Sequence, residues 1–130
     1  MIIHEQEITW ATHKLILTNK KAIYWQAQRT LILSDLHLGK AAHFRRNGIP
    51  IPAQIHQKDL DLLEILLHYY DVQKVIVVGD LIHANANGEV LDFKNFLQKF
   101  QAIEFILIKG NHDRIADRKI LDLGFKSVCN

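Results

Sequence analysis

Residues 75–80 read Val75-Ile76-Val77-Val78-Gly79-Asp80, an unbroken β-branched run that stops at a glycine and an aspartate. Two further unbroken apolar runs, Leu-Ile-Leu and Phe-Ile-Leu-Ile, occupy residues 31–33 and 105–108. None of the three alternates apolar with polar residues, which predicts strands buried on both faces, as in parallel sheets. Amphipathic helical patterns at residues 55–70 and 90–100 separate the runs. The chain therefore predicts an α/β fold, a mostly parallel sheet with crossover helices.

The amino-terminal 30 residues have a different pattern. Residues 14–18 and 22–25 alternate loosely, and the polar residues 19–21 between them read as a turn. This predicts an N-terminal β-hairpin. We expect Trp10 and Trp25 to pack in the core or on the hairpin rather than to stack on bases. Residues 1–130 are expected to form a single domain.

Composition excludes several classes of protein. The 130 residues carry a net charge of +2, and the single cysteine, Cys129, allows no internal disulfide, which favours a reducing compartment. No apolar run approaches the roughly 18 residues of a membrane span. We expect a cytoplasmic protein without a membrane partner. Residues 1–53 hold seven basic and three acidic side chains, a mild excess that is compatible with a polyanionic partner.

Polar segments follow all three apolar runs and hold the candidate site residues. If the strands are neighbours about 4.8 Å apart, Asp35, Asp80 and Asn111 approach one spot. Carboxylates held so close repel unless a cation lies between them, which favours a divalent metal. His37, two residues after Asp35, can reach the same ion, and the mixed oxygen and nitrogen donors suit manganese, iron or zinc better than calcium. His112 can donate a proton there. Taken singly, each residue also fits an ordinary turn.

The order of these segments adds a family resemblance. Asp35-x-His37, Gly79-Asp80 and Gly110-Asn111-His112-Asp113 resemble the first three motifs of the calcineurin-like metallophosphoesterase superfamily. The resemblance implies the first half of an α-β-β-α sandwich. It also implies a hydrolase that cleaves phosphate esters at a centre of two divalent ions, for which we expect Mn²⁺, with iron or zinc as alternatives.

A narrower resemblance covers about residues 20–125. The chain is similar to the ligase-associated DNA damage response endonuclease branch of the superfamily through segments at residues 24–25, 34–42, 44–45, 48–52 and 79–83. This implies a phosphodiesterase or endonuclease that acts on DNA or RNA. It further implies a place in DNA repair, with a DNA ligase and a helicase as partners.

The resemblance also implies a role for each matched residue. Asp35 and His37 bind the first metal, Asp80 bridges both metals, and Asn111 binds the second. A metal-bound hydroxide attacks phosphorus, and His112 acts as general acid or stabilises the transition state. Four more side chains are candidates for hydrogen bonding to the ligands or for contact with phosphate: His83, Asp113, Arg45 and Arg46. For the two arginines, a solvated basic loop is an equal alternative.

One departure from the family pattern affects the site. The superfamily takes three more histidines from two later motifs, whereas no histidine follows His112 in these 130 residues. We expect the N-terminal portion of a longer domain, or a short form completed by another chain, such as a second copy. The alternative function is an inactive remnant or binding module that keeps one weak metal site. A sheet covered on one side only is expected to self-associate.

Overall fold

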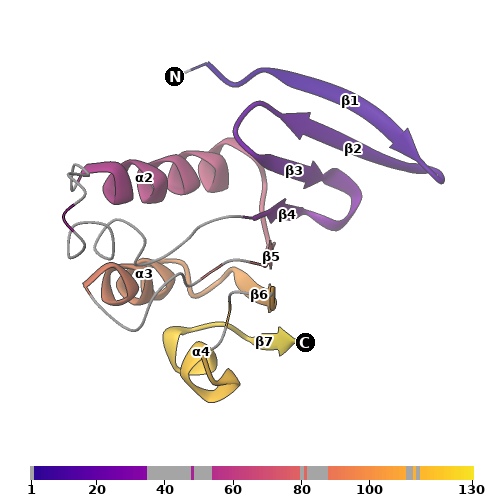
Figure 1. Ribbon diagram of the computed structural model, residues 1–130. Coiled ribbons are helices and arrows are strands. Elements are labelled where there is room, and N and C mark those ends of the chain that lie inside the picture. The colour runs from indigo at the N-terminus through magenta and orange to yellow at the C-terminus, as the bar shows by residue number, and fades with distance from the viewer. Residues whose placement is uncertain are drawn as a thin grey trace.

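A seven-stranded sheet with strand order β1-β2-β3-β4-β5-β6-β7 organises the molecule (Figure 1). The computed structural model describes residues 2–34, 48, 54–79, 81, 88–110, 113 and 115–130. Its strands are β1 (Glu5–Trp10), β2 (His13–Thr18), β3 (Ala22–Trp25), β4 (Thr30–Leu33), β5 (Lys74–Val78), β6 (Glu104–Ile108) and β7 (Ser127–Cys129). The α/β class is confirmed, and each predicted strand lies within one residue of its expected start.

Strands β1 to β4 form an antiparallel meander. Ile16 pairs with Tyr24 across the β2–β3 turn, which confirms the predicted hairpin. Strand β1 adds to the outer edge, and the short 3-10 helix η1 (Gln26–Gln28) connects β3 to β4. Because three of the six strand pairings are antiparallel, the described sheet is half parallel rather than mostly parallel.

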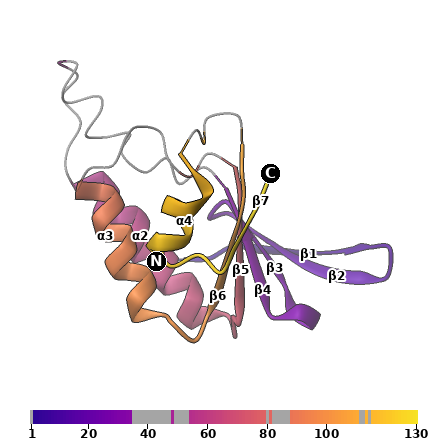
Figure 2. The same cartoon turned by 90° about the horizontal axis from the view of Figure 1, so that it is seen from below.

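Strands β4 to β7 form the parallel half, joined through α2 (Gln54–Tyr69), α3 (Gly88–Lys99) and α4 (Asp117–Leu123). The predicted helices correspond to α2 and α3. Parallel strands that are added in one direction through right-handed crossovers place every connecting helix on the same face. Figure 2 shows α2, α3 and α4 together on one side of the sheet. In the part of the chain that the structure describes, the three α-helices therefore cover a single face of the sheet.

Burial alternates along the central strands although their sequence does not. On β6, Phe105 and Leu107 are buried, whereas Ile106 between them is only partly buried. Strands β4 and β5 repeat this at Ile32 and Ile76, each of which lies between two buried neighbours. The prediction that both faces are buried is therefore wrong for these residues. The reason is that the described helices pack on one face only, and we call the other the open face.

The tip of the β1–β2 hairpin corrects a second expectation. Trp10 is 70% exposed, so it packs neither in the core nor on the hairpin. The physical reason is that β3 ends at Trp25, opposite Leu15, and the tip extends past it (Figure 2). Trp25 packs as expected, with its ring edge-on to His13 at 5.1 Å between centroids. None of the described helices is long and apolar enough to span a membrane.

Candidate functional site

The carboxyl-terminal ends of the adjacent parallel strands β4, β5 and β6 lie side by side at the same end of the sheet. Leu33 at the end of β4 pairs with Val77, and Val78 at the end of β5 pairs with Ile108 at the end of β6. In sequence, each of the three predicted site segments begins within two residues of such a strand end. Sequence order and strand pairing together bring the first residues of these segments to the carboxyl-terminal end of the strands. Open α/β sheets bind their ligands at this end.

Most predicted site residues fall outside the described part of the chain. This holds for all four proposed metal ligands and the proposed acid, and for three further candidates: Asp35, His37, Asp80, Asn111, His112, His83, Arg45 and Arg46. Their roles stay predictions. Among the described residues, no group of three or more histidine, cysteine or acidic side chains could hold a metal ion. The donor types at the proposed positions, carboxylate, imidazole and amide, still fit a manganese-like ion.

The backbone approaches closely where β5 and β6 end. Gly79 has a φ of +69°, a left-handed conformation that glycine adopts without a steric cost. Its N–H donates to the Ile108 carbonyl at 2.7 Å. A Cβ atom built on Gly79 would lie 3.5 Å from the Gly110 Cα atom. The two glycines therefore bring the two chain segments into contact directly before Asp80 and Asn111 in the sequence.

Asp113 is the one predicted site residue that the structure describes. Its side chain is buried, with 6% of the residue exposed. Oδ1 accepts a hydrogen bond from the Leu81 N–H at 2.8 Å, and Oδ2 accepts one from the Gly110 N–H at 2.9 Å. The Asp113 N–H in turn donates to the Gly110 carbonyl at 3.2 Å. Both carboxylate oxygens thus accept hydrogen bonds from backbone amides. This favours a hydrogen-bonding role for Asp113 beside the predicted ligands over contact with phosphate.

A cluster around Lys109 fixes the end of β6 to α4 and β7. Lys109 Nζ lies 2.6 Å from Asp117 Oδ1, and the Lys109 N–H donates to the Cys129 carbonyl at 2.8 Å. The hydrogen bond from Lys109 lowers the pKa of the Asp117 carboxyl, and a hydrogen bond from Asn130 adds to this effect. Lys109 was not among the predicted site residues, although its position directly before Gly110 was a signal.

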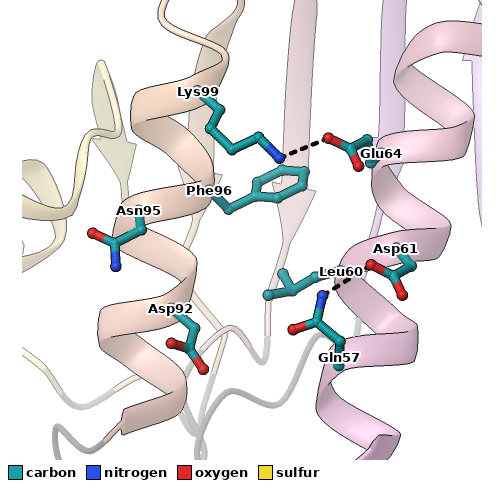
Figure 3. Close-up of a pocket in the computed structure, with 8 residues that line it drawn as sticks. All are labelled: Gln57, Leu60, Asp61, Glu64, Asp92, Asn95, Phe96 and Lys99. Carbon is teal, nitrogen blue, oxygen red and sulfur yellow. Dashed lines mark hydrogen bonds and ion pairs between the residues drawn. The ribbon is translucent and has the colours of Figure 1, made fainter.

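A groove of about 190 Å³ lies between α2 and α3, and residues of these two helices line it rather than the strand ends described above (Figure 3). Lys99 Nζ contacts Glu64 Oε1 across it at 2.9 Å, and Gln57 donates to Asp61 along α2. Asp92 adds a further carboxylate to the lining. Because acidic side chains outnumber the lysine, this groove repels phosphate and is not where we place a phosphate-ester substrate.

Comparison with known proteins gives a consistent result. The calcineurin-like phosphoesterase family model matches residues 28–128. The crystal structure of Pseudomonas putida nuclease MPE is similar at a TM-score of 0.79 and 31% sequence identity, covering 97% of this chain and 60% of that one. A protein of unknown function from Aquifex aeolicus, AQ665, matches at 20% identity and a TM-score of 0.49, too distant to support an argument. No curated protein matches the chain.

Proposed function

Because the chain belongs to the calcineurin-like phosphoesterase family, we propose that it contributes to a metal-dependent phosphodiesterase acting on nucleic acid. One observation carries the proposal: β4, β5 and β6 are adjacent parallel strands, and each is followed in sequence by one predicted ligand segment. The similarity to a nuclease supports a nucleic-acid substrate. The chain spans 60% of that nuclease, so the activity of the whole protein is part of the proposal.

The proposed roles follow from side-chain chemistry. Asp35, His37 and Asp80 would hold a first ion through two carboxylates and an imidazole, and Asp80 together with Asn111 would hold a second. When bound, divalent ions such as Mn²⁺ activate water and neutralise charge on the phosphate. His112 donates a proton to the leaving oxygen.

The biological setting is proposed on the resemblance to the ligase-associated branch. Damaged DNA is the substrate that this branch suggests, with a DNA ligase and a helicase as working partners. The basic character of residues 1–53 supports a polyanionic substrate, because excess positive charge raises the local concentration of nucleic acid. The cytoplasm is the proposed compartment.

Calorimetric titration with Mn²⁺ tests the metal site. We expect the wild-type chain to bind about one equivalent weakly, and Asp80→Asn to bind at least about tenfold more weakly, because it removes a charged ligand. Asp122→Asn is the matched control, since it makes the same chemical change on the exposed surface of α4. Equal affinity of wild type and Asp80→Asn would contradict the ligand assignment.

Hydrolysis of bis-nitrophenyl phosphate tests catalysis. His112 is the last histidine of these 130 residues, so Asp80 and Asn111 alone are proposed for the second ion. Losing that ion costs several kcal/mol of barrier, or several orders of magnitude in rate at about 1.4 kcal/mol per tenfold. We therefore expect turnover barely above background with Mn²⁺. Robust turnover that Asp35→Ala abolishes would contradict this and show that the missing ligands are supplied otherwise, for example by a second copy.

A further inference from the structure

We propose that Asp113 is a positioning residue. Its carboxylate fixes the backbone directly after Asp80, in the proposed metal-binding segment that follows β5, and directly before Asn111, in the one that follows β6. This inference rests on the proposed function. In this role Asp113 binds neither a metal nor a phosphate; its carboxylate accepts hydrogen bonds from the backbone amides of Leu81 and Gly110. Leu81 directly follows Asp80, and Gly110 directly precedes Asn111.

The hydrogen-bond geometry shows that the contact is more than a local turn. An aspartate that only closes a turn needs one nearby amide, and Gly110, three residues away, supplies it at 2.9 Å. The second oxygen reaches Leu81, which is 32 residues away in sequence, at 2.8 Å. One side chain therefore joins segments that leave two different strands.

Burial makes this arrangement specific. A carboxylate with only 6% of its residue exposed is unstable unless charge-assisted hydrogen bonds replace its hydration. Each bond fixes the direction of one amide, and so the orientation of the peptide units at Leu81 and Gly110. The close approach of Gly79 to Gly110 holds the same two segments together from the backbone side. Asp113 and the two glycines thus determine the spacing of the segments.

The consequence is a quantitative expectation for metal binding. Outer groups that orient metal ligands typically change metal affinity by about 10- to 100-fold when they are removed. Asp113→Asn keeps one acceptor oxygen but turns an NH₂ group toward a backbone N–H, so one of the two bonds is lost. We expect Asp113→Asn to bind Mn²⁺ about 10- to 100-fold more weakly than wild type, with every proposed ligand still present.

The control is Tyr24→Phe, which also removes a hydrogen bond that joins distant segments. Tyr24 Oη donates to the Asp71 carbonyl at 2.7 Å, and Asp71 precedes β5, at the opposite end of that strand from Gly79. We expect Tyr24→Phe to lose stability without losing Mn²⁺ affinity. If Asp113→Asn and Tyr24→Phe weaken Mn²⁺ binding equally, Asp113 is merely structural and the proposal is overturned.

A measurement on the wild type keeps the test independent of whether Asp113→Asn folds. Amide hydrogen exchange, followed by NMR without metal, should show Leu81 and Gly110 protected as hydrogen-bonded donors. Exchange of both at the rate of exposed amides would overturn the positioning role. Absence of Mn²⁺ binding by wild type would overturn the proposed function, and this inference with it. Mn²⁺ binding that Asp113→Asn leaves unchanged would overturn the positioning role alone.

Discussion

Neighbouring residues on β6 allow a direct test of one-sided burial. Leu107 is fully buried beneath the helices, whereas Ile106 on the open face is only partly buried. Leu107→Ala removes contacts from a packed core and leaves a cavity, so we expect a loss of about 2–5 kcal/mol in the free energy of unfolding. Ile106→Ala removes side-chain area that water already reaches. We expect it to cost about 1 kcal/mol, close to the full range of strand propensity.

Urea unfolding monitored by circular dichroism measures both losses. The comparison is made at low micromolar protein, where the open face is not covered by other copies. Equal losses for the two variants there would refute the reasoning, because they would show that Ile106 is as buried as Leu107.

At higher concentration we expect the wild type to self-associate. Val78 and Ile108 are 43% and 39% exposed, and together with Ile32, Ile76 and Ile106 they leave an apolar surface in contact with water. Light scattering should show particles heavier than a monomer. A sharp monomer that melts cooperatively at high concentration would contradict this expectation.

Two further predictions concern single residues. Gly79→Ala should cost about 1–2 kcal/mol of stability in urea unfolding, because φ is +69° there and an L residue is strained in the left-handed region; an unchanged midpoint would contradict that backbone conformation. Burial, and then the hydrogen bond from Tyr70 to Glu5 at 2.5 Å, raises the pKa of the Tyr70 hydroxyl above its ordinary value of 10.0. The stability it contributes is therefore fully present below pH 10 and lost as the pH rises above that value, and Tyr70→Phe should flatten the loss between about pH 10 and 12 in unfolding measured against pH. Identical profiles for Tyr70→Phe and wild type would count against the hydrogen bond.

Local patterns were sufficient for the central elements. The apolar runs at 31–33, 75–78 and 105–108 became β4, β5 and β6, and the helical patterns became α2 and α3. This worked because an unbroken apolar run or a helical pattern is contained within four to sixteen neighbouring residues. Neither α4 nor β7 was predicted. The seven residues of α4 are too few to establish a helical period, and β7, which reads Ser-Val-Cys, is not an unbroken aliphatic or aromatic run.

The candidate site divides in the same way. The residue types after each strand, and their order, are properties of the sequence. They were enough to predict a metal site, and their resemblance to the metallophosphoesterase motifs implied the phosphate chemistry. The structure adds that the three strands are adjacent and parallel, which brings the starts of the three segments to the same end of the sheet. The individual ligand positions stay predictions, because Asp35, His37, Asp80 and Asn111 lie outside the described residues.

By itself the sequence determined that both faces of the central strands are apolar, because hydrophobicity belongs to each residue. Only the tertiary structure decided which face is covered: the three helices lie on one side of the sheet, and Leu107 is fully buried whereas its neighbour Ile106 is only partly buried. The sequence likewise contained Asp113 but not its partner. The Leu81 amide is 32 residues away and comes within 2.8 Å only because β5 and β6 pair in parallel, which brings their carboxyl ends to the same edge.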